Sequence, residues 1–367
     1  MLDGALLHIV KHEITTKALG ARIDKIFMPS RDEIVLLISK KGFSGKLLFS
    51  AKANSPRVHF TEFAPENPAV PPMFCMLLRK HLVNGRLIEI RQAGLDRIVF
   101  FDFECKNELG DNVVLTLIME IMGRNSNIIL VRDGKVIDAV KRVDPESSIR
   151  FILPGATYEL PPAQDKVNLL ENEPAAVLTA LSHAKDEELS KALQMTLDGA
   201  SPIVCRELAH LALRGEQLRL SELTETHKER LGFYLGRLRE TILSGGTPTL
   251  VSDKDDRPID FTYTSVTQYG LLASTKVLES YSELLDAFYA KRDKIERLRS
   301  RSQDLLRLLT NITERLSRKI NARKSDLKAT ENRERLREYG ELIKANIHTL
   351  KNGDPFCETV NYYDPDC

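Results

Sequence analysis

The sequence predicts an α+β protein with three parts: an antiparallel, strand-rich domain with helices, then an all-helical domain, then a long helical arm. Three observations support this prediction. Short apolar runs separated by Gly, Pro, Asn and Asp fill most of the first 160 residues, which is typical of strands joined by turns. Residues 167–245 have helical periodicity, and residues 278–350 keep a helical period without a proline.

Two helices and eight or nine strands account for the first domain, predicted at residues 1–165. The stretch DGALLHIVKHEITTKAL places Leu6, Leu7, Val10 and Ile14 on one helical face. The stretch PPMFCMLLRKHLVNG has prolines at its start and Gly85 at its end, the usual asymmetry of a helix. Short turns favour an antiparallel meander in a sandwich or barrel-like domain. The strand runs are RIDKIFM, EIVLLIS, KLLFSAK, RVHFT, RLIEIRQAG, DRIVFFDFEC, DNVVLTLIMEIM, SNIILVRD and KVIDAVKRV.

The proline-rich segment FILPGATYELPPAQ ends the first domain, and a helical domain is predicted at residues 166–246. Inside it one helix ends near Asp198 and Gly199, and Ser201 with Pro202 begins the next helix as N-cap and first residue. Backbone N–H groups at such a helix start can hold a phosphate, as in a helix-hairpin-helix nucleic-acid module. Gly199 and Ser201 are therefore predicted phosphate contacts, and an ordinary helical corner is the alternative.

An extended segment and a long arm complete the chain. Residues 247–277 include PIDFTYTSV, which alternates well enough for an edge strand packing back on an earlier domain. The arm occupies residues 278–350, and residues 351–367 form a middle or tip segment. At about 1.5 Å per residue, this arm is on the order of 100 Å long and needs a partner helix or a large target.

A heptad seam along the arm predicts a coiled coil. The spacing of its apolar residues follows a heptad repeat as far as Leu316, and the next one, Ile320, comes four residues later, as in a stutter. The residues of the seam are Ile295, Leu298, Leu305, Leu309, Ile312, Leu316 and Ile320. Because no second arm follows, we expect either a truncated chain or a dimer through the unpaired arm.

Positive charge is concentrated in the arm. Residues 291–345 hold 17 Lys and Arg against nine Asp and Glu, a local charge of +8, whereas the whole chain carries +1. Such an element suits a polyanion, and the alternative is a solvated helix whose charges pair with each other. The cations expected to meet the polyanion are Arg315, Arg318, Lys319, Arg323 and Lys324.

Composition points to a water-soluble protein of the cytoplasm. No run approaches the roughly 20 apolar residues of a membrane span, and the start MLDGALLHIVKHE has an acid at position 3 and no basic leader. Five cysteines form no CxxC pair, which argues against a disulfide framework or a zinc site and indicates a reducing compartment.

Motifs for catalysis or for cofactors are absent from the sequence. It contains no GxxxxGK[ST], GxGxxG or HExxH. His8 and His12 are four residues apart without a nearby third ligand, so surface positions explain them better than a metal site. No nucleophile–base arrangement stands out either. We therefore expect no enzyme activity, no cofactor and no metal.

Two polar stretches are candidate sites. Asp96 and Arg97 stand next to each other at the mouth of the apolar run IVFF, where a solvated strand end is the simplest explanation. The turn GRNSN lies between two strands and is rich in hydrogen-bond donors. It is either an ordinary hairpin turn or a polar lip that bonds phosphates or base edges. Its polar residues are Arg124, Asn125, Ser126 and Asn127.

Several stretches together resemble one family along the whole chain. They are MLDG, PPMFCMLLRKHL, LDRIVFF, MGRNSNIIL, FILPGATYELPP, DGASPIVCREL, SYSELLDAFY and NYYD. The chain resembles the NFACT family of ribosome quality-control proteins, RqcH-type in bacteria and often labelled fibronectin-binding proteins. The resemblance implies an NFACT-N domain, a helix-hairpin-helix domain and a coiled-coil arm, without the returning arm and the NFACT-R domain of full-length members.

The resemblance also implies an activity. Such proteins bind the large (50S) ribosomal subunit that carries a stalled nascent peptidyl-tRNA. They recruit tRNA, chiefly alanyl-tRNA, for template-free addition of a C-terminal alanine tail, and the ribosomal peptidyl-transferase centre makes the bonds. By position, the tailing residues match Asp96 and Arg97, an N-terminal aspartate matches Asp3, and the GRNSN turn falls where tRNA approaches. The cations of the arm would then meet ribosomal RNA, and no membrane is involved.

Two other classes of function stay open. One is a nucleic-acid-binding module related to formamidopyrimidine-DNA glycosylases but without their chemistry, because the chain begins Met1-Leu2-Asp3 and lacks zinc-finger cysteines. The other is a fibronectin-binding adhesin, since a basic coiled coil can bind extracellular matrix through charge.

Overall fold

The structure is a computed structural model that describes residues 2–63, 66–144, 150–353, 355–356 and 358–364. In the long helix it leaves out the side chains at positions 290, 291, 294, 296–301, 304 and 331. The chain divides into two compact units, Met1–Asp293 and Lys294–Cys367.

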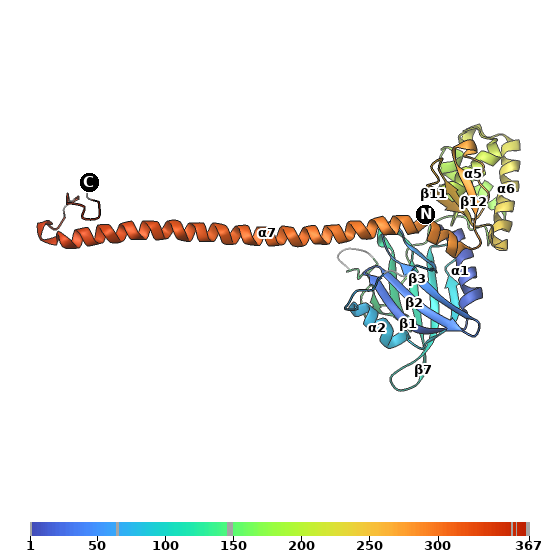
Figure 1. The fold of residues 1–367 in the computed structure, drawn as a ribbon. Helices are drawn as coiled ribbons and strands as arrows, with labels where there is room; N and C mark the ends of the chain where they lie inside the picture. Colours follow the sequence, from blue (N-terminus) through green and yellow to red (C-terminus); the bar gives the residue numbers. More distant parts are fainter. Residues whose placement is uncertain (1, 64–65, 145–149, 354, 357, 365–367) are drawn as a thin grey trace. The chain divides into compact units, whose positions relative to one another are not determined.

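Nine antiparallel strands of the first unit form one sheet in the order β4-β3-β2-β1-β5-β6-β7-β8-β9 (Figure 1). Each of the nine predicted apolar runs forms one of these strands, so that part of the sequence prediction is confirmed. The strands are β1 (Arg22–Ser30), β2 (Glu33–Lys40), β3 (Phe43–Ser50), β4 (Arg57–Phe60), β5 (Arg86–Gln92), β6 (Ile98–Lys106), β7 (Asn112–Glu120), β8 (Asn127–Arg132) and β9 (Lys135–Ala139).

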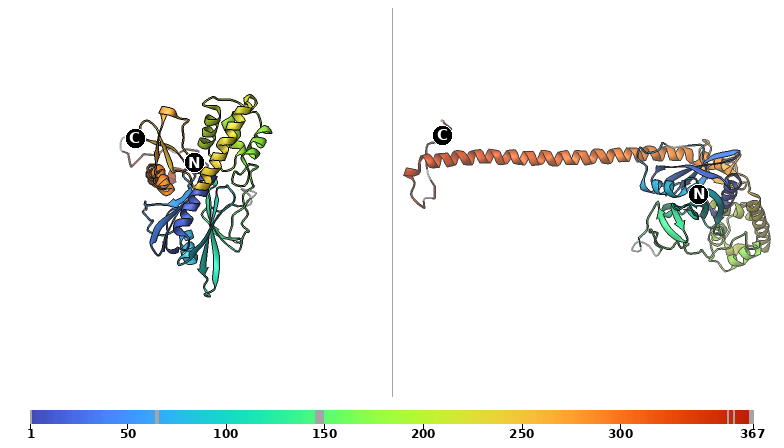
Figure 2. Two further views of the ribbon diagram at one scale, coloured as in Figure 1. Left: turned by 90° about the vertical axis from the view of Figure 1, so that its right-hand side faces the viewer. Right: turned by 90° about the horizontal axis from the view of Figure 1, so that it is seen from below.

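The sheet folds upon itself where β1 meets β5. In the described part of the sheet, a single residue pair, Arg22 with Arg86, joins these two strands. The halves β1–β4 and β5–β9 are splayed around a shared core, as the left view of Figure 2 shows. Across that core, Phe49 of β3 packs edge-on against Phe101 of β6 with ring centroids 4.8 Å apart. One continuous sheet supplies both layers, which agrees with the barrel-like alternative of the prediction and not with a sandwich of two separate sheets.

Helices α1 (Gly4–Ala18) and α2 (Met73–Leu82) pack on this sheet, as predicted. α1 contacts β2, β4 and β5, and α2 contacts β1 and β6. The predicted apolar face of α1 is buried. α1 has Asp3 as its N-cap, and its end is marked by Gly20 with φ +79°. A residue with a Cβ avoids that backbone region, so the glycine sets the end of the helix.

The helical part consists of α3 (Pro174–Ser182), α4 (Leu189–Thr196), α5 (Pro202–Leu213) and α6 (Glu225–Ser244). Ser201 is the N-cap of α5 and Pro202 its first residue, as the sequence predicted. Between α4 and α5, Gly199 has φ +67°, which allows the sharp joint. Whether this joint acts as a helix-hairpin-helix module stays a prediction.

A second, three-stranded sheet follows the helices. Its strands β10 (Thr249–Ser252), β11 (Pro258–Thr262) and β12 (Ser274–Val277) are ordered β11-β10-β12. The loop after β11 is fixed to α5, because buried Glu207 accepts hydrogen bonds from the backbone N–H and hydroxyl of Thr267 and from the backbone N–H of Gln268, at 2.6–3.0 Å. The small sheet is thereby attached to the helical part.

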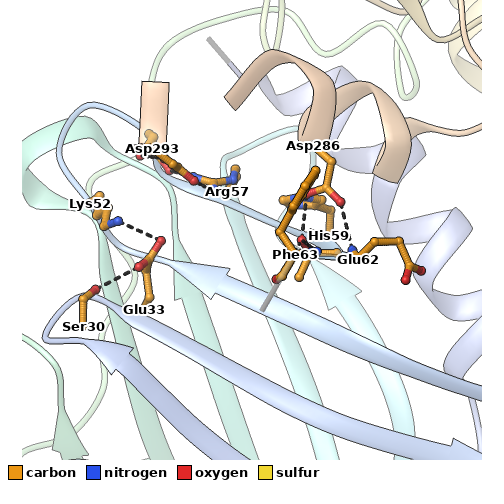
Figure 3. Close-up of polar contacts among 11 residues, drawn as sticks. Ser30, Glu33, Lys52, Arg57, His59, Glu62, Phe63, Asp286 and Asp293 are labelled. Atoms are coloured by element: carbon orange, nitrogen blue, oxygen red, sulfur yellow. Dashed lines mark hydrogen bonds and ion pairs between the residues drawn. The ribbon is translucent and has the colours of Figure 1, made fainter. Parts of the chain in front are cut away.

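A buried polar network ties β4 to the beginning of α7 (Tyr281–Ala345) within the first unit (Figure 3). Arg57 Nη2 lies 2.5 Å from Asp293 Oδ2, and both side chains are almost fully buried. His59 Nε2 lies 2.9 Å from Asp286 Oδ1, which also accepts from the Thr61 hydroxyl at 2.7 Å. Since a carboxylate only accepts, a neutral His59 donates from Nε2.

Acidification is expected to destabilise this first unit. Burial lowers the pKa of His59. Burial raises the pKa of Asp286, but its hydrogen bonds with His59, Thr61 and the backbone of Glu62 outweigh that effect and hold it low. The folded state therefore binds fewer protons than the unfolded chain, in which a histidine pKa is about 6.5. Stability is present above that pH and is lost as the pH falls through and below it.

The melting temperature between about pH 7.5 and about pH 5 tests this expectation. The variant His59→Gln keeps an N–H donor but cannot take up a proton, so its melting temperature should fall less steeply. Equal slopes for the variant and the natural chain would contradict a role for His59 in the pH dependence.

The second unit consists of most of α7 and the segment after it. Tyr363 Oη donates to Glu341 near the end of α7, and Arg337 Nε donates to the same carboxylate at 3.0 Å. The predicted heptad residues in the described part of this unit are exposed, whereas the side chain of Leu298 lies outside the described residues. The structure holds one arm without a partner helix among its described residues, so the coiled coil stays a prediction. Among those residues, no helix has the length and apolarity needed to cross a lipid bilayer.

Candidate nucleic-acid interface

Asp96 and Arg97 lie in the turn that joins β5 to β6. The N–H of Asp96 donates to the carbonyl of Ala93 at 2.9 Å, and Gly94 has φ +55°. Asp96 Oδ1 accepts from the N–H of Arg97 at 2.6 Å, and the Arg97 carbonyl accepts from the N–H of Ile121 at 2.8 Å. Both side chains are half-buried. The pair is thus held by a well-bonded turn, whose backbone bonds do not depend on the Arg97 side chain.

Gln92 fastens this turn to the start of α1. Its Nε2 donates to the carbonyls of Asp96 at 2.9 Å and Gly4 at 3.0 Å. A Cβ at Gly4 would lie 1.6 Å from the carbonyl oxygen of Leu95, so only glycine fits there. The turn and the first residues of α1 are therefore in direct backbone contact.

The α4–α5 joint packs against the same place. The N–H of Ala5 donates to the carbonyl of Gly199 at 2.9 Å. A Cβ at Gly199 would lie 2.7 Å from Leu95 Cβ, in addition to its positive φ. The structure thus brings together the Asp96–Arg97 turn, the start of α1 and the predicted phosphate-binding joint, which are far apart in the sequence. We call this assembly of residues 3–5, 92–97 and 198–201 the three-segment junction.

Asp3 lies inside this junction, between the N-termini of α1 and α5. Its Oδ1 accepts from the N–H of Leu6 at 2.7 Å, and its Oδ2 accepts from the N–H of Ser201 at 2.8 Å. The residue is 8% exposed. Burial raises the pKa of Asp3, and the hydrogen bonds with Ser201 and Leu6 oppose that shift. Both helix N-termini favour a negative charge here.

These bonds bear on two predictions. The buried Asp3 carboxylate is already bonded to two backbone donors of the protein, which indicates a positioning role, and its contact with RNA stays a prediction. Ser201 is also buried, and its N–H is the donor that Asp3 uses. The anion at the start of α5 is therefore the chain's own carboxylate, and both residues position the junction.

Asp198 is a residue that sequence reasoning placed at a helix end but did not assign to the site. Burial raises the pKa of Asp198, and the nearby charge of Asp96 raises it further. The carboxylates of Asp96 and Asp198 are thus close together, and the charge of Lys166 opposes part of this shift. The one feature of the sequence that could have assigned Asp198 to the site is its position directly before Gly199, a predicted phosphate contact.

The GRNSN turn divides into an exposed and a buried half. Gly123–Asn125 form a 3-10 turn, in which Arg124 and Asn125 are exposed. Ser126 is fully buried, and its hydroxyl accepts from the N–H of Met122 at 2.8 Å.

Asn127 is buried as well. It donates to the carbonyl of Lys141 at 2.7 Å and accepts from the N–H of Lys141 at 2.9 Å. Ser126 and Asn127 are therefore fixed inside the fold, and their contact with RNA stays a prediction. A buried polar side chain needs partners, and here the backbone of the same fold provides them.

The exposed half of this turn stands at the same end of the sheet as the Asp96–Arg97 turn. Ile98, the first residue of β6, pairs with Glu120, and the Arg97 carbonyl bonds Ile121, two residues before Gly123. This end of the sheet therefore presents a guanidinium from each turn together with an exposed amide. Such groups bind phosphates and the edges of bases.

The five predicted cations of the arm belong to the other unit. All five are exposed, and Arg318 lies 3.4 Å from Glu314, one turn earlier. Their contact with ribosomal RNA stays a prediction. Among the described residues of both units, no group of three or more His, Cys, Asp or Glu could hold a metal ion.

Comparison with known proteins gives a consistent result. The family model described as "NFACT N-terminal and middle domains" matches residues 3–367. The chain is 37% identical over 365 residues to "Rqc2 homolog RqcH" of Bacillus subtilis (strain 168), covering 99% of this chain and 61% of that protein. It is 24% identical over 366 residues to "Ribosome quality control complex subunit NEMF" of Homo sapiens, covering 94% and 32%.

A solved structure supports the same relationship. The N-terminal part of the fibronectin/fibrinogen-binding protein from Streptococcus suis is 34% identical, with a TM-score of 0.65, and the match covers 79% of this chain and all of that one. The chain spans 61% of the length of its Bacillus subtilis relative. It belongs to the NFACT family, of which it carries the N-terminal and middle domains.

Proposed function

We propose that this protein is a ribosome-associated quality-control factor that binds tRNA at the Asp96–Arg97 turn. The relatives' names place them in ribosome quality control, and the family match covers the chain. The observation that carries the proposal is the three-segment junction, which fixes Asp96 and Arg97 in a rigid turn at the surface.

In this proposal the longer protein binds the obstructed large ribosomal subunit and recruits tRNA, chiefly alanyl-tRNA. A template-free alanine tail then grows on the stalled chain, and the ribosome makes each bond. The protein itself contributes binding and positioning and no catalysis. The cations of the arm, Arg315 to Lys324, supply the electrostatic contact with ribosomal RNA.

The two side chains of the turn have different roles. Arg97 can donate two parallel hydrogen bonds to a phosphate or to a guanine edge. Asp96 would be repelled by phosphate, so its carboxylate accepts from an exocyclic amine of a base or orients the guanidinium. A site with both groups distinguishes a particular folded RNA from a generic polyanion.

Sequencing of RNA recovered with the chain tests this proposal. We expect one or a few tRNA species, with alanine tRNA foremost, to be enriched over total cellular RNA. The Arg97→Ala variant should lose that enrichment. Recovery of RNA in cellular proportions, equal for both proteins, would refute tRNA recognition by this part of the family.

A second candidate function is binding of fibronectin or fibrinogen. The name of the similar Streptococcus suis protein, a fibronectin/fibrinogen-binding protein, favours it. Binding to immobilised fibronectin that persists at high salt and is not competed by tRNA would support this candidate. Binding that vanishes with salt would indicate charge alone.

A further inference from the structure

We propose a second RNA-binding site at the opposite end of α1 from the three-segment junction, one that takes backbone phosphates. Four cations, Arg22, Lys40, Lys41 and Arg86, line a shallow hollow of about 610 Å³. The remaining lining residues are Leu19, Gly20 and Ser39. We call this hollow the α1-end basin. The inference rests on the proposed RNA function and adds to it a site that the family resemblance did not indicate.

Strand pairing builds the basin. Arg22 of β1 pairs with Ser39 of β2 on one side and with Arg86 of β5 on the other. Directly paired residues share one face of a sheet, so the two arginines stand side by side. Lys40 ends β2 and Lys41 begins the turn after it. The basin thus lies where β1 meets β5, between the two halves of the sheet.

The end of α1 forms the wall. The N–H of Gly20 donates to the carbonyl of Leu87 at 2.8 Å, which fixes the helix end to β5. A Cβ at Gly20 would lie 3.6 Å from Arg86 Nη2, so the guanidinium rests beside the bare glycine. Lys40 Nζ donates to the carbonyl of Leu19 at 3.1 Å. Lys40 therefore caps the C-terminal end of α1, and this hydrogen bond is enough to explain why a lysine stands there.

The other cations are not explained by such a bond. Arg22 Nη2 lies 3.7 Å from Asp24, a loose and exposed ion pair. Glu104 is the strand partner of Arg86, but no ion pair joins them within 4.0 Å among the described residues. Arg86 and Lys41 are exposed, and in the described part of the chain neither makes a side-chain hydrogen bond or ion pair. The positive charge of the basin therefore exceeds its negative charge.

A nucleic-acid backbone fits this arrangement better than a lipid surface does. Guanidinium and ammonium groups around a hollow match phosphate oxygens. Membrane binding needs apolar side chains for insertion, and Leu19 is the one large apolar residue in the lining. The basin and the Asp96–Arg97 turn lie at the two ends of β5, about 20 Å apart for a strand of this length. Folded RNA offers phosphates at both places.

The test compares two charge-matched double variants of the whole chain. Arg86→Gln with Lys41→Gln removes the two cations of the basin that make no side-chain hydrogen bond or ion pair in the described part of the chain. Arg132→Gln with Lys135→Gln removes one arginine and one lysine from the β8–β9 hairpin, and both are exposed. The affinity for bulk tRNA and for large-subunit ribosomal RNA is measured as a function of salt, after circular dichroism has confirmed the fold.

We expect the basin variant to bind at least one of these RNAs roughly tenfold more weakly, with the slope of log K against log salt reduced by about 2, one for each lost phosphate contact. The hairpin variant should bind as the natural chain does. Equal binding of both variants to both RNAs would overturn the proposal. The proposal would also be overturned if the basin variant lost only its binding to phosphatidylglycerol vesicles, which would assign the basin to membranes. It would equally be overturned if millimolar inorganic phosphate removed the difference in RNA affinity between the basin variant and the natural chain, which would indicate a small-anion site.

Arg97→Ala separates this inference from the proposed function. If Arg97→Ala weakens binding and the basin variant does not, the basin is wrong and the proposed function stands. If only the basin variant weakens binding, the basin stands and the assignment of tRNA to the Asp96–Arg97 turn fails.

Discussion

Replacing Arg97 by alanine is expected to weaken tRNA binding by about tenfold to a hundredfold, the loss of one bidentate contact worth about 1–3 kcal/mol. The fold should persist, because the bond from Ile121 N–H to Arg97 uses the backbone carbonyl and not the side chain. Fluorescence anisotropy with labelled tRNA at one fixed salt concentration measures the change, since affinities at different salt are not comparable.

Arg97→Lys and Arg132→Ala serve as controls. Lysine keeps the charge but not the planar fork, so its affinity should fall between those of the natural chain and Arg97→Ala. Arg132 lies on the β8–β9 hairpin and should have little effect. If Arg97→Ala instead lowers the melting temperature and leaves tRNA binding intact, the turn has only a structural role.

Replacing Asp3 by alanine is expected to destabilise the first unit by about 2–4 kcal/mol. The change removes the N-cap of α1 and leaves the N–H groups of Leu6 and Ser201 without their acceptor inside the protein. A lost N-cap costs about 0.5–2 kcal/mol, and a buried unsatisfied donor costs about 1–3 kcal/mol. The midpoint of urea unfolding measures this loss.

Asp3→Asn separates positioning from direct contact. Asparagine keeps the shape and one acceptor oxygen, so the loss of stability should be smaller and tRNA binding should survive. A variant that folds as stably as the natural chain but no longer binds tRNA would mean that the Asp3 carboxylate itself meets RNA. That result would contradict a purely positioning role for Asp3 between the two helix N-termini.

Local features of this fold were predictable from the sequence. Alternating apolar runs gave the nine strands, and Ser201 with Pro202 gave the start of α5, because the physical signal for each lies within a few residues. Strand pairing order carries no such local signal. A single sheet bends at the Arg22–Arg86 pair, where two separate sheets could have formed. That arrangement depends on contacts between residues that are distant in the sequence.

The same distinction applies to the polar residues. Asp3 bonds Ser201 across 198 positions, and Arg57 bonds Asp293 across 236. The sequence shows a charged residue but not the distant residue that it bonds. A buried carboxylate with a structural role therefore cannot be told from a functional one. Ser126 and Asn127 looked like free donors in a turn for the same reason. Arg97 and Arg124 could be placed at one sheet end only once the β6–β7 pairing was known.

The central claim is that this surface recognises folded RNA and does more than attract negative charge. The most direct test is competition at near-physiological salt between tRNA and a polyanion without base edges, such as heparin or polyphosphate. We predict that tRNA binds at least about tenfold more tightly and that Arg97→Ala removes most of this preference. Equal affinity for tRNA and for the polyanion, unchanged in Arg97→Ala, would contradict the claim.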